Sequence, residues 1–176
     1  MSKKINNEAK AIIIKTTVVH TLTYFICGIA AFFLFHYGVA LNDSSFMRPA
    51  TDAIVKAGVV FQPIRGLLFG IVFFLLRDIL FKRKNGWLIA WIMLVFVGIF
   101  STFGPTPGSI EGFIYLKEGI IKTSGGITEI LVQSFLLSFI TYYWVNHPEK
   151  KWLNWVNGSL FVIVLTLPIL GLLTQR

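Results

Sequence analysis

The sequence predicts an all-α, polytopic integral membrane protein in which residues 1–176 form one domain, a bundle of five transmembrane helices. Composition is the first reason: 55% of the 176 residues are hydrophobic, and the mean hydropathy is +0.74. Scarcity of charge is the second, since charged residues make up 14% of the chain where about 25% is usual. A soluble protein needs more polar surface than this chain supplies, so we expect it to reside in lipid.

Five long apolar runs define the expected helices. They cover residues 16–41, 59–81, 87–103, 127–145 and 155–173. About 20 residues of α-helix cross a hydrocarbon core of roughly 30 Å, and a helix bonds its own backbone polar groups there. The first run is too long for a cleavable signal peptide and lacks a small-residue cleavage pattern after it. We therefore expect it to remain as a membrane anchor.

Basic residues in the connections predict the orientation. If the chain crosses at every run, nine Lys and Arg residues lie on the amino-terminal side and five on the other, with net charges of +7 and +1. The positive-inside rule then places the amino terminus in the cytoplasm and the carboxyl terminus outside. All the tryptophans fall near the expected cytoplasmic ends, where indoles favour the headgroups; they are Trp87, Trp91, Trp144, Trp152 and Trp155. We expect a plasma membrane, of the bacterial inner-membrane kind.

Two outer connections are long enough to hold short interfacial helices. In residues 47–58, Arg48-Pro49 precedes apolar residues at helical spacing, and Pro is tolerated in a first helical turn. In the second connection, the turn sequence of residues 104–108 precedes Ser109, which can cap a helix. The apolar face of that helix comprises Ile110, Phe113, Ile114, Ile120 and Ile121. Such a helix either covers the bundle or forms a lid over a polar site.

Ionisable residues inside the runs are functional candidates, because charge is costly in a bilayer. Arg77 and Asp78 lie at the end of the second run, where an Arg side chain can reach the headgroups. Arg65 and Glu129 each lie 16 residues before the expected cytoplasmic end of their run, about 24 Å along a straight helix. This matched depth predicts a salt bridge between Arg65 and Glu129, since each would otherwise be an isolated buried charge.

Other polar and small residues share faces with these two charges. Gln62 precedes Arg65 by three positions and Gln133 follows Glu129 by four, so each pair lies on one helix face. Gly66 and Gly70 form a G-x-x-x-G step that lets a helix approach closely, and Ser134 and Ser138 form a comparable track. We expect these tracks to bring the second and fourth helices together, within one subunit or between subunits. The candidate ligand-binding residues are Gln62, Arg65, Glu129 and Gln133, with Glu111 and His36 as outer members.

Two alternatives to a ligand site stay open. The constellation can be a polar clamp between helices without a ligand. Arg65 also follows Pro63 closely, so it can lie in a first helical turn and extend outward to the headgroups. The charge-swapped double variant of Arg65 and Glu129 distinguishes a pair from two independent charges.

The absence of known motifs excludes several chemistries. The sequence contains no HExxH motif, paired Cys ligands, phosphate-binding loop, dinucleotide fingerprint or G-x-S-x-G. Cys27 is the only cysteine, so no intrachain disulfide can form. We expect no metal and no cofactor. The basic clusters have no aromatic platform that would indicate nucleic-acid binding.

Three functions remain. The first is a membrane-embedded binding or transport protein with an outward-facing polar pocket between the second and fourth helices, in which Arg65 holds an anionic group and Glu129 orients it or carries a proton. The second is a lipid-acting membrane enzyme that uses Glu129 or Glu111 as general base. The third is a structural or accessory subunit whose G-x-x-x-G face packs on a larger partner. Expected partners are membrane lipids and a further copy of the chain or a larger membrane complex.

Overall fold

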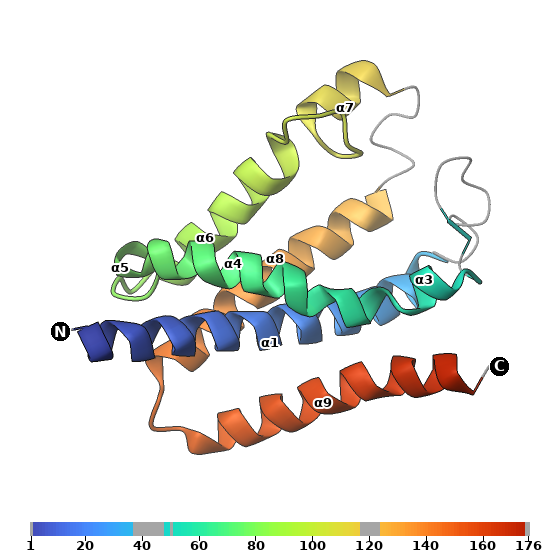
Figure 1. Cartoon of the computed structure of the whole chain (residues 1–176). Coiled ribbons are helices and arrows are strands. Elements are labelled where there is room, and N and C mark those ends of the chain that lie inside the picture. The colour runs from blue at the N-terminus through green and yellow to red at the C-terminus, as the bar shows by residue number, and fades with distance from the viewer. Residues whose placement is uncertain (1, 37–47, 50, 117–123, 175–176) are drawn as a thin grey trace.

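The computed structural model describes residues 2–36, 48–49, 51–116 and 124–174, and within them it contains helices and no strand (Figure 1). The helices, in chain order, are α1 (Ser2–Leu34), α3 (Ala53–Lys56), the 3₁₀-helix η1 (Gly58–Phe61), α4 (Gln62–Leu75), α5 (Arg77–Leu80), α6 (Gly86–Val95), the π-helix η2 (Phe96–Phe100), α7 (Ile110–Tyr115), α8 (Ser124–Asn146) and α9 (Lys151–Leu173). Successive long helices run in alternating directions, and the two chain ends lie at opposite ends of the bundle (Figure 1).

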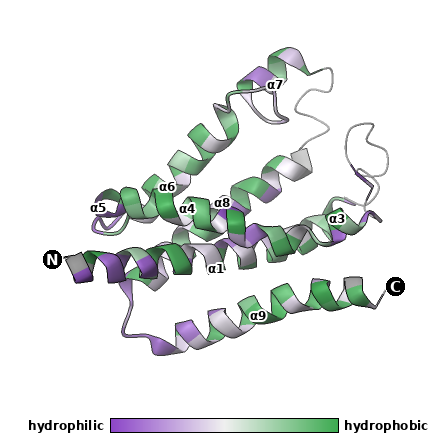
Figure 2. Ribbon diagram, viewed as in Figure 1, coloured by the Kyte–Doolittle hydropathy of each residue, from purple (hydrophilic) through white to green (hydrophobic). Residues whose placement is uncertain are grey.

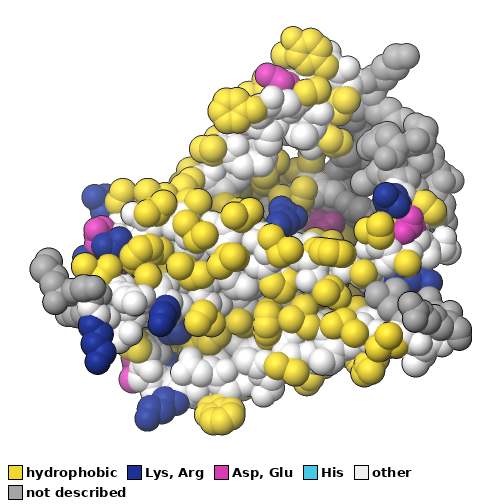
Figure 3. Space-filling model, in the orientation of Figure 1, with side chains coloured by type: hydrophobic (Ala, Val, Ile, Leu, Met, Phe, Trp, Pro, Cys, Tyr) yellow, Lys and Arg dark blue, Asp and Glu magenta, His cyan; other side chains and the backbone are white. Residues whose placement is uncertain are grey.

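Four of these helical segments are long and apolar enough to cross a membrane. They are Ile5–Leu34, Gly58–Leu75, Gly126–Asn146 and Lys151–Gly171. Large hydrophobic side chains remain exposed along these segments and cover much of the surface in Figure 3. Hydrophilic residues gather instead where α1 begins, at α5 and where α9 begins (Figure 2). This distribution indicates a membrane location, as predicted from composition.

The expected third span is the shortest of the apolar helices. The helix of Gly86–Phe100 has 15 residues, about 22 Å in α-helical geometry, and its last five residues form a π-turn. Residues 101–103, which we expected to complete the span, form a turn rather than a helix. Length and composition therefore support four membrane crossings, but they do not establish the fifth.

Two other boundaries differ from the sequence prediction. α1 begins at Ser2 rather than near residue 16, so the lysine-containing amino-terminal segment is helical from the start. α4 ends at Leu75 because Leu76 has φ −96° and ψ 11°, which are not helical, and the chain restarts as the short α5. The second run is thus two helices rather than one helix to residue 81.

α1 is the central helix of the bundle. It packs most extensively on α4, then on α8, and also contacts α9. Its inward face is polar, since Thr16, His20, Thr21 and Thr23 are all buried. The threonine hydroxyls donate to carbonyl oxygens one turn earlier, for example from Thr16 to Ile12 over 2.8 Å. Hydroxyls that are satisfied within their own helix can be buried without a partner on another helix.

The G-x-x-x-G step of α4 packs on α1 and not on α8. A Cβ at Gly66 would lie 2.7 Å from the Cα of Thr17, and one at Gly70 would lie 2.9 Å from the Cα of Ile13. Ser134 and Ser138 of α8 are buried, and α8 packs on α1 and α6. The expectation that these tracks join the second and fourth helices is therefore wrong within the chain: α1 fills the place between them.

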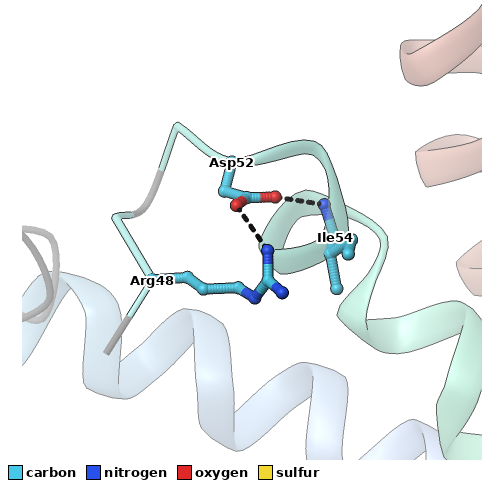
Figure 4. Close-up of polar contacts among 3 residues, drawn as sticks. All are labelled: Arg48, Asp52 and Ile54. Atoms are coloured by element: carbon cyan, nitrogen blue, oxygen red, sulfur yellow. Dashed lines mark hydrogen bonds and ion pairs between the residues drawn. The ribbon is translucent and has the colours of Figure 1, made fainter. Parts of the chain in front are cut away.

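The two outer connections contain shorter helices than expected. α3 begins after Asp52, which accepts a hydrogen bond from the Ile54 amide over 2.8 Å and pairs with Arg48 over 3.1 Å (Figure 4). Pro49 thus precedes the helix and is not in its first turn. α7 begins after Ser109, whose Oγ accepts from the Gly112 amide over 2.9 Å, as predicted. α7 ends at Tyr115, and residues 117–123, which include Ile120 and Ile121, lie outside the described residues.

Candidate functional site

The best-defined polar contact inside the bundle joins α4 to α1. Gln62 is buried at the start of α4, and its Nε2 donates to the carbonyl oxygen of Gly58 over 3.1 Å. Its Oε1 is then left to accept from His20 Nε2, 3.2 Å away. His20 is 1% exposed, and its Nδ1 makes no hydrogen bond with any described residue. The imidazole therefore presents one paired and one unpaired nitrogen to the interior.

Arg65 is exposed, at the edge of the α4 face on which Gln62 is buried. It is the fourth residue of that helix, which has Pro63 in its first turn, so the expected first-turn position is confirmed. Its guanidinium carbon lies 6.0 Å from the ring centroid of Phe69, and Phe69 in turn packs on His20 with ring centroids 5.0 Å apart. Among the described residues, Arg65 makes no ion pair and donates no hydrogen bond. A cation within an apolar segment without a protein anion is uncommon.

Glu129 approaches α1 from the other side, on α8. It is half-buried, and a Cβ at Gly28 of α1 would lie 3.8 Å from its Oε1. Tyr24 of α1 interacts electrostatically with both Glu129 and Arg65. Its hydroxyl would be 3.7 Å from a Cβ at Gly58. Arg65 and Glu129 therefore share one tyrosine of the central helix as an electrostatic neighbour.

The predicted salt bridge between Arg65 and Glu129 does not occur among the ion pairs of the described residues. The depth estimate fails because α4 ends at Leu75, ten residues after Arg65, while α8 continues to Asn146, 17 residues after Glu129. The contacts with α1 also indicate different depths, because Gly66 faces Thr17 whereas Glu129 faces Gly28. Thr17 and Gly28 are eleven residues apart on α1, which is about 16 Å along the helix. The two charges lie at different levels of the bundle.

The remaining predicted site residues are less closely connected. Gln133 is half-buried one turn after Glu129 and makes no hydrogen bond with a described residue. Glu111 is half-buried in the first turn of α7, and among the described residues it has no ion pair. His36 is exposed beyond the end of α1 and has a φ of 51°. Glu111 and His36 are thus not brought to Arg65 by any contact of the described chain.

Sequence reasoning missed His20 and Tyr24. A signal for both was present, because Thr16, His20 and Tyr24 recur at four-residue intervals and Thr17, Thr21 and Gly28 lie beside them. Polar and small residues at that spacing form one face of a helix. In a membrane helix such a face points into the bundle, which marks α1 as the central helix.

Two ion pairs lie at the amino-terminal end of the bundle. Arg77 lies 3.8 Å from Glu8 of α1 and donates to the carbonyl oxygen of Phe74 over 3.1 Å. Asp78 pairs with Lys82, and this hydrogen bond together with the lysine charge lowers the pKa of the Asp78 carboxyl. Both pairs are at the surface, so they bind the helix ends weakly. Arg65 and Arg83 make no ion pair among the described residues, and of these two only Arg65 lies within an apolar segment that can cross a membrane.

The junction of α1, α4 and α8 thus offers a cation, a carboxylate, a phenol, an amide and an imidazole with an unpaired nitrogen. Among the described residues no group of three His, Cys, Asp or Glu side chains could hold a metal ion. An anion can bind at Arg65, where the Tyr24 hydroxyl lies within electrostatic range of the guanidinium. Comparison with known proteins finds no family model that matches the chain, and no similar curated protein or solved structure.

Proposed function

We propose that this protein is a membrane-embedded binding or transport protein, and that Arg65 holds the anionic group of its ligand. The proposal includes a five-span topology, with the amino terminus in the cytoplasm and the ligand site nearer the outer face. The alternating direction of the long helices supports the fifth crossing by α6 and η2 (Figure 1). The excess of Lys and Arg in the connections on the amino-terminal side supports the orientation. The small chain and its short connections are the basis for proposing a bacterial plasma membrane.

The observation that carries the proposal is the guanidinium of Arg65. It lies within the apolar segment Gly58–Leu75 and has no anionic partner among the described residues. A membrane protein that retains such a charge either extends it to the headgroups or binds an anion with it. The Tyr24 hydroxyl, which interacts electrostatically with Arg65, favours the second use, because a phenol can donate a hydrogen bond to an anion.

The two other functions have less support. The G-x-x-x-G face, which motivated an accessory subunit, is occupied by α1 of the same chain. An enzyme would need a second group close to its general base, and no contact among the described residues connects Glu111 with Glu129. Anion binding needs only a cation and a hydrogen-bond donor, and Arg65 and Tyr24 can supply these.

A binding experiment tests the proposal. The protein, in nanodiscs of phosphatidylcholine, is titrated with succinate, benzoate and inorganic phosphate while its thermal midpoint is recorded. We expect at least one anion to raise the midpoint of the natural protein, because a ligand that binds only the folded state stabilises it. The shift should vanish in Arg65→Gln and persist in Arg77→Gln, the matched control.

Two results contradict anion binding at Arg65. One is that none of the three anions changes the midpoint of the natural protein. The other is that Arg65→Gln and Arg77→Gln respond equally, which assigns the effect to general surface charge. Uptake of labelled succinate by proteoliposomes then separates a transporter from a binding protein, since succinate does not cross the bilayer unaided at neutral pH.

A further inference from the structure

The exposed face of α4 carries a shallow groove that begins at Arg65. Its lining residues are Arg65, Leu68, Phe69 and Val72, and its volume is about 230 Å³. Their spacing of three, four and seven residues places them in one stripe along the helix. The stripe extends over seven residues, about 10 Å. The lining therefore follows one stripe of α4, with its single charge at one end.

The groove runs along the edge of the buried face of α4. Gln62, Gly66, Gly70 and Phe73 of that face are buried. Leu68 is 60% exposed and Val72 43% exposed. Because α4 belongs to a segment that can cross a membrane, the groove opens toward lipid rather than toward water.

The floor of the groove is held in place by the buried polar pair. Phe69 is half-buried, and its ring contacts His20, which is itself fixed by the hydrogen bond to Gln62. The same ring lies 6.0 Å below the guanidinium carbon of Arg65. Phe69 thus orients the cation at the end of the groove and supplies an apolar surface beside it.

We propose that the groove binds a single-chain anionic amphiphile, with its carboxylate at Arg65 and its acyl chain along Leu68, Phe69 and Val72. This inference rests on the proposed function and names the ligand class of the same site. The polarity of the lining selects this class. A small hydrophilic anion would leave the apolar stripe unused, and an uncharged lipid would leave the guanidinium without a counter-charge. The ligand enters sideways from the bilayer.

Decanoate is the probe for this site. Labelled decanoate is titrated onto the protein in phosphatidylcholine nanodiscs by scintillation proximity, and empty nanodiscs correct for partition into lipid. We expect saturable binding, with decanol and succinate competing at least about tenfold more weakly. Val72→Trp should lower decanoate affinity about tenfold by filling the groove, whereas Leu75→Trp, an exposed position outside the lining, should bind as the natural protein does.

The same variants separate this inference from the proposed function. If decanol competes as well as decanoate, or if Val72→Trp and Leu75→Trp bind decanoate equally, the amphiphile does not lie in the groove. Anion binding at Arg65 then still stands if a small anion shifts the thermal midpoint in an Arg65-dependent way. If decanoate binding is saturable but unchanged in Arg65→Gln, the carboxylate does not lie at Arg65 and this inference is overturned; the proposed function is overturned as well only if the midpoint shift with small anions is also unchanged in Arg65→Gln.

Discussion

The close approach of α4 to α1 gives the sharpest prediction about the fold, namely that Gly66→Ala destabilises the protein. A Cβ at position 66 would lie 2.7 Å from the Cα and 2.9 Å from the carbonyl oxygen of Thr17. Carbon atoms in favourable contact are about 3.5–4.0 Å apart. Both opposing atoms belong to backbone, so the helices must separate by roughly 1 Å, since no side chain can move aside.

The magnitude follows from two opposing effects. Overpacking a tight contact costs about 1–3 kcal/mol. The replacement of Gly by Ala inside a helix returns up to about 1 kcal/mol through helix propensity. Separation of the helices also lengthens the bond between Gln62 and His20, which is already 3.2 Å. We therefore expect a net loss of about 1–3 kcal/mol in the free energy of unfolding.

Thermal and denaturant unfolding of the purified protein measures this loss. The matched control is Gly158→Ala in α9, where a new Cβ would meet no atom within 4 Å. That variant should be neutral or slightly stabilised, by up to about 1 kcal/mol. If Gly66→Ala is as stable as Gly158→Ala, the two helices do not approach as closely as described, and the central position of α1 is wrong.

Three further predictions concern single polar groups. Thr141 Oγ1 is buried and has no hydrogen-bond partner among the described residues, so Thr141→Val should raise the free energy of unfolding by about 1–3 kcal/mol; a lower thermal midpoint would show that the hydroxyl is satisfied. Gln62→Leu leaves the His20 Nε2 proton unpaired and should lower the free energy of unfolding by about 1–3 kcal/mol. Gln133 is half-buried, so Gln133→Leu should leave the free energy of unfolding nearly unchanged. Equal losses in the two variants would contradict the pairing of Gln62 with His20. The Ile54 amide and Arg48 lower the pKa of Asp52 below its ordinary 3.8. The carboxylate therefore caps α3 fully above pH 3.8, and this cap is lost as the pH falls through the lower, folded-state pKa. Hydrogen exchange at the Ile54 amide should accelerate only in that acid range, and acceleration already between pH 5 and 7 would exclude the carboxylate as its cause.

Hydrophobic runs and composition were sufficient to predict the helical class and the membrane location. Both depend on a property that the sequence carries locally, namely whether about 20 consecutive residues can be placed in lipid. Helix ends were less predictable for a physical reason. The end of α4 depends on the backbone of Leu76, an apolar residue that gives no sign of a break in its side chain.

The arrangement of the site depends on helix packing, which single-sequence patterns describe poorly. The G-x-x-x-G step correctly indicated a close contact on α4, but a small-residue step does not identify its partner. Gln62 and Arg65 were also found correctly on one helix, although they point in different directions, Gln62 toward His20 and Arg65 toward the surface. Only the packing of α1 determines which of the two is buried.

The central position of α1 explains why opposite charges on α4 and α8 do not meet. For Arg65 to reach the level of Glu129, α4 would have to slide along α1 by about 16 Å, the distance between Thr17 and Gly28. The backbone contacts at Gly66 and Gly70 prevent that movement, because every other position of α4 would place a Cβ against α1. Tyr24 is the group within electrostatic range of both charges. A bound anion at Arg65 therefore affects Glu129 most directly through Tyr24, and Tyr24→Phe should weaken any dependence of anion affinity on Glu129→Gln.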